Sequence, residues 1–485
     1  MQRLRTILFY VFAALYLAGT PMAILYALGY QIRPGRAQSF IKTGLISLRT
    51  EPSGARVYLG NSRYRWKTPT MIRDLKPGDY PIRLTLRDHQ PWSATVRVEP
   101  EKATILDHLL LLPNQLPLST LSTLRMEDLR PVPDEEAFLL QAGKLGADLY
   151  VGEIGGDEVR HLMPSNDVAW AWEILSIHHR PDNPCVLLEG RDPAGTHFGW
   201  RRLDQLKEPT LDITSLFPQP VQVVAWDAKS RNELFTLADQ KLNRLDLGDR
   251  ALYPDLVGNV RSFALYRNEL YVLDASNQLY RTSRDGERKP EHLGQAPSEI
   301  KQSWFSRRGY ELHPLDEDTV LLVGPDGQCL INRVPYQIME KGWQGNLRHP
   351  DEKLLLLWDQ RRIGRFAFPS GERDPQLAAP AAEWLYTSPR PIEQVFWCHE
   401  NSHLLIAGAG QLDLLPLERG GGPPARWVAN YEPGTSVFYS ERAGAAYFLE
   451  PGSGLLKRLQ ILNRLNLRSL TRSTKPDDPA EAAQP

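Results

Sequence analysis

From Leu118 onward the sequence repeats one pattern, and this repeat restricts the possible folds more than any other feature. Each copy starts with a strand-like run containing aromatic residues, followed by a second apolar strand, a tight turn and a third strand. The copies lie about 40 to 50 residues apart, which is typical of propeller blades. The first strands are expected at Trp172, Val223, Phe263, Ser303, Gly345, Val395 and Val437. We therefore predict a β-propeller over residues 118–470.

Seven units of the repeat are clear, and an eighth is less regular. It runs from Ser119 through residues 138–140 and 150–152. A closed ring needs a strand from the other end of the domain, and we expect either Leu465 with Leu467 or the strand at residues 104–112 to supply it. Short radial sheets leave few open edges, which favours a propeller of seven or eight blades. Two stacked β-sandwiches are the alternative fold.

The N-terminal region contains a long apolar run. From Ile7 to Leu28 the sequence has no charged side chain, and 22 helical residues reach about 33 Å, enough to cross a bilayer. We predict a transmembrane helix over residues 7–28, with a short tail at 1–6 and a spacer at 29–43. A cleaved signal peptide is the alternative, but its apolar core is normally shorter and ends at a small-x-small site, which Met22-Ala23-Ile24 does not provide.

The orientation of this helix does not follow from charge alone. Arg3 and Arg5 precede the apolar run, whereas Arg33, Arg36 and Lys42 follow it. Positive residues are enriched on the cytoplasmic side of membrane helices, so the two flanks give opposite answers.

A small β-module is expected after the spacer. Apolar residues alternate at Ile46 and Leu48 and again at Ile82 and Leu84, as in half-buried strands. The segment Lys76–Asp79 suits a type II turn, because Pro77 presets φ and Gly78 tolerates the positive φ of the third position. We therefore predict a small antiparallel sandwich over residues 44–113.

This module resembles the PEGA domain, a family named for a Pro-Glu-Gly-Ala motif. The matching positions are Pro52, Ser53, Gly54, Ala55, Thr68, Pro69, Pro77, Gly78, Tyr80 and Trp92. Ser53 replaces the Glu of the name, and His89-Gln90 stands where a Gly-Tyr pair is usual. The resemblance implies a domain outside the cytoplasm, since PEGA domains are typical of surface and secreted proteins. It implies structural residues and no catalytic one.

Sequence motifs for chemistry are weak throughout the chain. There is no nucleophile elbow, phosphate loop or zinc-protease motif. His178, His179 and Asp182 could bind a metal ion, but adjacent strand residues point to opposite faces, which favours a surface loop. Residues 316–318 (Asp-Glu-Asp) lack calcium-loop spacing, and the glycines at 420–422 precede two prolines rather than a helix. We predict no cofactor and no metal site.

Two residue types leave alternatives open. Cys185, Cys329 and Cys398 are far apart and odd in number, so whether any two of them pair is undecided. Tryptophans could stack on sugar rings or pack between blades, and packing is favoured because large aromatic side chains are mostly buried. The tryptophans concerned are Trp304, Trp343, Trp384 and Trp397.

Composition excludes one class of partner. With 57 basic and 58 acidic residues scattered along the chain, we expect no concentrated positive surface of the kind that nucleic acids require. Residues 471–485 are rich in Pro, Ala and charge and are expected to be disordered.

We therefore expect a single-pass, membrane-anchored protein with a cytoplasmic N-terminus and its folded domains outside the cell. It would contact membrane lipid through residues 7–28 and bind an envelope protein or glycan as a scaffold, without catalysis. The alternative function is a propeller enzyme that acts on a cell-surface glycan or another polymer.

Overall fold

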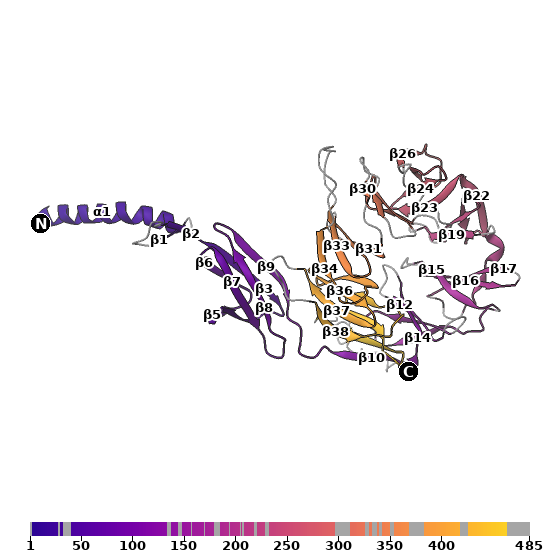
Figure 1. Cartoon of the computed structure of the whole chain (residues 1–485), viewed down its shortest axis with the longest axis horizontal. Helices are drawn as coiled ribbons and strands as arrows, with labels where there is room; N and C mark the ends of the chain where they lie inside the picture. Colours follow the sequence, from indigo (N-terminus) through magenta and orange to yellow (C-terminus); the bar gives the residue numbers. More distant parts are fainter. Residues whose placement is uncertain are drawn as a thin grey trace, which may run out of the picture.

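The chain forms a helix, a two-sheet β-module and a ring of four-stranded sheets, in that order (Figure 1). The computed structural model describes residues 2–27, 30–32, 40–132, 137–143, 148–156, 158–168, 170–178, 185–193, 195–203, 205, 208–217, 221–227, 232–295, 311–324, 329–331, 337–338, 342–349, 354–367, 383–417 and 425–462. The predicted tail at 471–485 and His179 and Asp182 lie outside these residues. So do Trp304 and the glycines at 420–422.

Helix α1 (Gln2–Ala27) includes most of the predicted membrane span. Each of the five consecutive side chains from Leu8 to Phe12 is more than half exposed. In the part of the chain that the structure describes, no helix has the length and apolarity that a membrane crossing needs. The span Ile7–Leu28 therefore stays a prediction. The expected spacer contains a short antiparallel pair, β1 (Tyr30–Ile32) and β2 (Phe40–Lys42).

The β-module is a sandwich of two sheets. One sheet has the order β6 (Thr70–Leu75), β3 (Gly44–Glu51), β9 (Ala103–Leu110), and the other has the order β5 (Ser62–Lys67), β4 (Arg56–Leu59), β7 (Gly78–Thr85), β8 (Trp92–Val98). Alternate residues of the strands face inward, and Ile46, Val57, Ile82 and Trp92 are buried between the sheets. The predicted sandwich is confirmed, but it is not wholly antiparallel. Strands β3 and β9 run parallel, which is possible because they begin and end the module and no hairpin joins them.

The motif residues Gly54, Ala55 and Thr68 are joined by hydrogen bonds at the turn between β3 and β4. The backbone N–H of Gly54 donates to the carbonyl of Thr68 over 2.8 Å, and the N–H of Ala55 donates to Thr68 Oγ1 over 3.0 Å. Thr68 Oγ1 also lies 2.5 Å from Thr50 Oγ1. Because Ala55 and Thr68 are buried, these bonds satisfy backbone groups that water cannot reach.

The predicted type II turn at Lys76–Asp79 is wrong. Gly78 has a φ of 153°, whereas the third position of that turn needs about 80°. The chain does not fold back as a hairpin here, because β6 and β7 belong to different sheets. Pro77 and Gly78 instead carry the chain across the sandwich, and the Tyr80 hydroxyl donates to the carbonyl of Lys76 over 2.9 Å.

The rest of the described chain forms eight four-stranded sheets, which confirms a propeller-like fold; each sheet is called a blade below. Seven blades are built from consecutive strands: β11–β14 (Asp128–Pro131, Ala137–Gln141, Leu149–Glu153, Val159–Met163), β15–β18 (Trp172–His178, Cys185–Asp192, Gly195–Arg202, Leu211–Asp212), β19–β22 (Val221–Trp226, Glu233–Ala238, Lys241–Asp246, Ala251–Val257), β23–β26 (Val260–Tyr266, Glu269–Asp274, Gln278–Ser283, Glu291–Gln295), β27–β30 (Glu311–Pro314, Val320–Val323, Cys329–Ile331, Gln337–Ile338), β31–β34 (Gly345–Arg348, Leu354–Trp358, Arg362–Ala367, Glu383–Thr387) and β35–β38 (Gln394–Cys398, His403–Gly408, Gln411–Pro416, Arg426–Asn430). A single-turn helix, η1 (Thr214–Leu216), follows β18.

The eighth blade closes the ring. Its strands are β39 (Phe438–Ser440), β40 (Ala445–Leu449), β41 (Leu455–Gln460) and, as the outermost strand, β10 (Leu118–Arg125). Both predicted closing strands are therefore replaced by β10, in which Leu118 pairs with Leu459. The strand at residues 104–112 belongs largely to β9 of the module, and Leu465 and Leu467 lie outside the described residues.

The cores of the propeller lie between adjacent blades. Second strands such as β32 and β36 are buried along their whole length, because a neighbouring blade covers each of their faces. This explains why they read as continuous apolar runs, while the outer strand β22 is mostly exposed. The predicted first strand at Ser303 lies outside the described residues, and the first described strand of that blade begins at Glu311.

Candidate functional site

The propeller and the β-module pack directly against each other. Leu110, at the end of β9, and Leu112, just after it, are buried in the cluster formed by the last two blades. Tyr431, Tyr439 and Leu462 belong to the same cluster. The end of the module therefore contributes to the core of the ring, which holds the module against these blades (Figure 1).

Polar contacts border this apolar junction. Arg426 of β38 donates to the side-chain oxygen of Gln90 over 3.2 Å and to the carbonyl of Pro91 over 3.3 Å. Glu51 Oε2 of the module lies 3.4 Å from Nδ1 of His399 in the propeller. A second pair joins His108 Nδ1 to Glu400 Oε2 over 3.0 Å. His399 and Glu400 are therefore the propeller residues of two contacts with the module.

Both residues lie in an unusual turn between β35 and β36. The φ angles of His399, Glu400 and Asn401 are 54°, 52° and 64°. The left-handed region costs non-glycine residues roughly 1–2 kcal/mol each. Three such residues in succession persist only where the surroundings hold them.

Glu441 provides this restraint from the next blade. Its carboxylate accepts the backbone N–H of His399 over 2.9 Å and that of Glu400 over 3.1 Å. It also accepts the hydroxyl of Tyr439 over 2.8 Å. Charge-assisted bonds of this kind are stronger than neutral ones, so Glu441 fixes the turn that contacts the module.

Two buried histidines lie in or beside the junction, and both have lowered pKa values. His399 is only 1% exposed, and burial lowers its pKa although Glu51, Glu441 and Glu400 act in the opposite direction. Burial also lowers the pKa of His403 to about 3, and the neighbouring His399 adds to the effect. Both side chains are therefore neutral at pH 7, and Nδ1 of His403 lies 2.8 Å from the hydroxyl of Ser402.

A cleft of about 710 Å³ opens between the two domains beside this junction. Its module wall consists of residues from the end of β8 through β9, and its propeller wall comes from blades β31–β34 and β35–β38. The residues that line it are Arg97, Glu99, Lys102, Ala103, Thr104, Ile105, Leu106, Asp107, His349, Leu354, Leu356, Arg365, Leu385, Trp397, Asn401, Ser402 and Leu417.

The module wall is the side of the sandwich where both sheets end. Strands β8 and β9 are the last strands of their sheets. The carbonyl of Lys102 accepts the N–H of Leu45 in β3, so alternation turns the N–H and C=O of Ala103 and Ile105 away from β3. The Ile105 side chain is 61% exposed. This wall therefore presents backbone polar groups and an apolar side chain together.

The propeller wall is aromatic and aliphatic. The indole N–H of Trp397 donates to the carbonyl of Arg348 over 3.0 Å, and its ring meets that of His349 edge-on with 4.9 Å between centroids. These contacts fix the ring orientation. Charged groups flank the cleft: Lys102 pairs with Glu99 over 2.5 Å, and this hydrogen bond is the main cause of the lowered pKa of Glu99.

The metal candidate at His178, His179 and Asp182 lies largely outside the described residues. Within the described residues, no three His, Cys, Asp or Glu side chains are placed to hold a metal ion. Cys185 and Cys398 are buried, while the side chain of Cys329 lies outside the described set. Trp343 is buried, as the packing interpretation predicts, whereas Trp384 is 39% exposed beside it.

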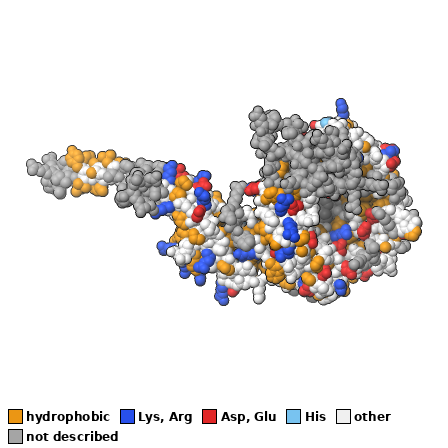
Figure 2. All heavy atoms as spheres, viewed as in Figure 1, with side chains coloured by type: hydrophobic (Ala, Val, Ile, Leu, Met, Phe, Trp, Pro, Cys, Tyr) orange, Lys and Arg blue, Asp and Glu red, His pale blue; other side chains and the backbone are white. Residues whose placement is uncertain are grey.

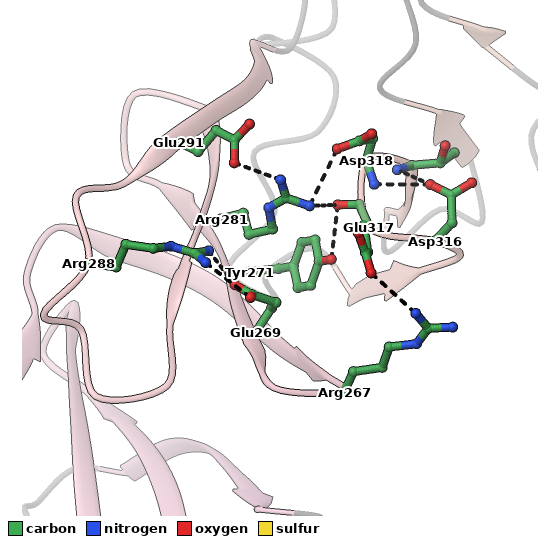
Figure 3. A network of polar contacts seen from close by, with 10 residues as sticks. Arg267, Glu269, Tyr271, Arg281, Arg288, Glu291, Asp316, Glu317 and Asp318 are labelled. Atoms are coloured by element: carbon green, nitrogen blue, oxygen red, sulfur yellow. Dashed lines mark hydrogen bonds and ion pairs between the residues drawn. The ribbon is translucent and has the colours of Figure 1, made fainter. Parts of the chain in front are cut away.

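The Asp-Glu-Asp segment at 316–318 forms hydrogen bonds between its own blade and the preceding one (Figure 3). Arg281 of β25 donates to the carbonyl of Glu317 over 2.8 Å and to the carboxylate of Glu291 over 2.6 Å. The Tyr271 hydroxyl also donates to the carbonyl of Glu317, over 3.0 Å. These bonds tie the β27–β28 turn to the preceding blade, so the segment has a structural role.

Sequence reasoning missed the junction residues. The motif positions that it selected support the fold of the module, and the cleft is formed by other residues. The polar segment His399–Ser402 between two apolar strands was the available signal, because a hairpin turn rich in titratable side chains is a common place for contacts. His108 and Glu441 gave no such signal, since each acts on a segment distant in sequence.

The class of the protein follows from these features: a PEGA domain is packed on a propeller-like domain with eight described blades. The family model of the PEGA domain matches residues 43–110. No curated protein matches the chain in sequence.

Several solved structures are similar to this chain at low sequence identity. The computationally designed Ika8 protein is 11% identical, with a TM-score of 0.42, 70% of this chain and 97% of that chain covered. The Cps50 (Swd1) β-propeller domain of Myceliophteria thermophila is 10% identical, with a TM-score of 0.39 and coverages of 71% and 100%. The N-terminal domain of Nup159 is 14% identical, with a TM-score of 0.35 and coverages of 72% and 99%.

Proposed function

We propose that this chain is a single-pass, membrane-anchored protein of the cell envelope that binds another envelope macromolecule in the cleft between its PEGA domain and its propeller. The observation that carries the proposal is the cleft itself, because both domains supply its walls and the packed junction holds those walls together. Clefts between domains are a preferred location for binding sites.

The membrane anchor is supported by the surface of α1. Five consecutive residues of a helix point in all directions around its axis, and Leu8, Phe9, Tyr10, Val11 and Phe12 are all exposed. A helix that is apolar on every side is stable in lipid or in a protein core. Residues 7–28 would therefore contact membrane lipid, with the N-terminus in the cytoplasm and the folded domains outside.

The open side of the PEGA domain favours a polypeptide segment over a glycan as the bound molecule. An extended peptide can add a strand to a sheet edge through main-chain hydrogen bonds, while alternate side chains enter pockets. The outward N–H and C=O groups of Ala103 and Ile105 offer such an edge. Trp397 and Leu385 across the cleft provide an apolar surface for the side chains.

The sidedness of the anchor can be tested with protease and intact cells. We expect protease added outside to cleave the chain beyond Arg33, because the proposed orientation exposes all the folded domains. Western blots against an N-terminal tag would follow the products. Cleavage that occurs only in inverted vesicles would show the opposite orientation.

The cleft can be tested with a photo-crosslinking amino acid at position 105 in the membrane-bound full chain. We expect one defined protein adduct there and none from position 253, an exposed site on β22 in a different blade. Ile105→Asp, with the crosslinker moved to position 103, should reduce the adduct about tenfold, because an apolar contact is replaced by a charge that must lose water. Equal adducts from positions 105 and 253, or no adduct at all, would contradict the proposal.

A further inference from the structure

The outer face of the four-stranded PEGA sheet is strongly basic. In the cross-strand pairing, Tyr58 of β4 lies opposite Arg63 of β5 on one side and Arg83 of β7 on the other. Arg56 lies opposite Lys67 in the next pair. We call the following exposed residues the basic face: Arg56, Arg63, Arg65, Lys67 and Arg83.

The charges of the basic face are not neutralised within the domain. Over the described residues, none of its five members forms an ion pair with a carboxylate. Two of them stack on aromatic rings instead, with Arg83 4.7 Å from the ring of Tyr58 and Arg65 4.9 Å from that of Trp66. Such stacking restrains a guanidinium group and leaves its N–H donors available.

An exposed aromatic residue adjoins these charges. Trp66 lies on the edge strand β5 and is 57% exposed. Tryptophan is enriched at membrane–water interfaces, where its ring sits at the level of the lipid headgroups. A basic surface with an exposed indole therefore matches a lipid surface better than it matches a soluble polyanion, which would use the charge alone.

The basic face also lies on the side of the domain that is nearer to the proposed membrane helix α1. Strand β5 is on the side of the module nearer α1, whereas β9 is on the side of the propeller (Figure 1). Lys and Arg side chains gather on that side of the module in the space-filling view (Figure 2). The 16 residues between Ala27 and Gly44 can span at most about 55 Å, which keeps the PEGA domain within reach of a membrane that holds α1.

We propose that the basic face binds the headgroups of anionic phospholipids in the membrane that anchors α1. The inference rests on the membrane anchor of the proposed function and adds a second contact with the same bilayer. Each basic side chain near an anionic surface strengthens binding roughly fivefold. The second contact would orient the PEGA domain, and with it the cleft, relative to the membrane.

The test uses the full chain in nanodiscs of phosphatidylcholine, with or without phosphatidylglycerol. Hydrogen exchange of the β5 amides at residues 62–67 is the measurement. We expect exchange to slow about tenfold when phosphatidylglycerol is present, since three of the five charges lie on β5. Arg63→Glu combined with Arg65→Glu and Lys67→Glu should abolish this difference.

The matched control reverses three exposed charges on the propeller, at Arg250, Lys289 and Arg361, and it should keep the lipid-dependent slowing. Unchanged exchange in β3 would show that the β5 variant folds. Equal exchange in both lipids, with the chain in the disc, would overturn the basic-face inference alone. A chain that does not enter the disc would overturn the anchor and the inference together. Equal slowing by soluble polyphosphate in phosphatidylcholine discs would also overturn the basic-face inference. It would indicate that the basic face binds a soluble polyanion.

Discussion

Replacing Glu441 by Ala is expected to destabilise the turn at His399–Asn401 by about 3 kcal/mol, because two backbone N–H groups and one buried hydroxyl lose a charged acceptor. The turn contains three left-handed residues, so it has no favourable local conformation to retain once this acceptor is gone. Hydrogen exchange of the amides at residues 398–404 should become about 100-fold faster, because each loss of about 1.4 kcal/mol from the opening free energy speeds exchange about tenfold.

The conservative variant Glu441→Gln should give an intermediate acceleration, because its amide keeps one acceptor oxygen and loses the charge. The matched control is Glu153→Ala, which removes an exposed ion pair with Arg160 and should change stability by less than about 1 kcal/mol. If exchange at the turn were the same in Glu441→Ala and in the unaltered chain, Glu441 would not be the residue that holds the turn.

Acidification from pH 7 to pH 5 is expected to weaken the propeller through its buried histidines. The pKa of His403 is about 3 in the folded chain, against about 6.5 when the chain is unfolded. Below pH 6.5 the unfolded chain therefore binds a proton that the folded chain does not. The free energy of unfolding falls by about 1.4 kcal/mol per pH unit in this window, or about 2 kcal/mol by pH 5.

His399 acts in the same direction, because its pKa is also lowered. Urea unfolding at pH 7, 6 and 5 would measure the effect. In the His403→Gln variant we expect to lose most of the pH dependence of unfolding that comes from His403, since Gln does not titrate. The carboxylates with lowered pKa values, such as Glu450 and Asp359, stay ionised down to pH 5 and contribute little. A pH dependence identical in the variant and the unaltered chain would contradict this assignment.

Much of the fold could be predicted because repeats and periodicity are local signals. The spacing of Trp172, Val223 and Phe263 located real first strands, since the blades that contain them are built from consecutive strands. The partner of the last strand could not be predicted in the same way. Pairing between β10 and β41 joins residues such as Thr120 and Lys457, and nothing local in either strand identifies the other.

The cleft was beyond sequence reasoning for a related reason. Ile105 reads as one more apolar residue of a strand, but its neighbour Leu106 is the buried one and Ile105 faces outward. His108 reads as a lone histidine. It becomes part of the junction only because a bulge in β9, where its φ is 63°, brings it to Glu400. Such features depend on the packing of whole domains rather than on local patterns.

The closing blade has a consequence for how this protein is made. Strand β10 leaves the ribosome early, but its partner β41 is among the last described strands to be synthesised. Until then β10 has an unpaired edge, and the apolar faces of the first and last blades are uncovered, which exposes a nascent chain to aggregation. Truncations that end before Leu455 are therefore expected to yield open rings that are prone to degradation rather than smaller stable propellers.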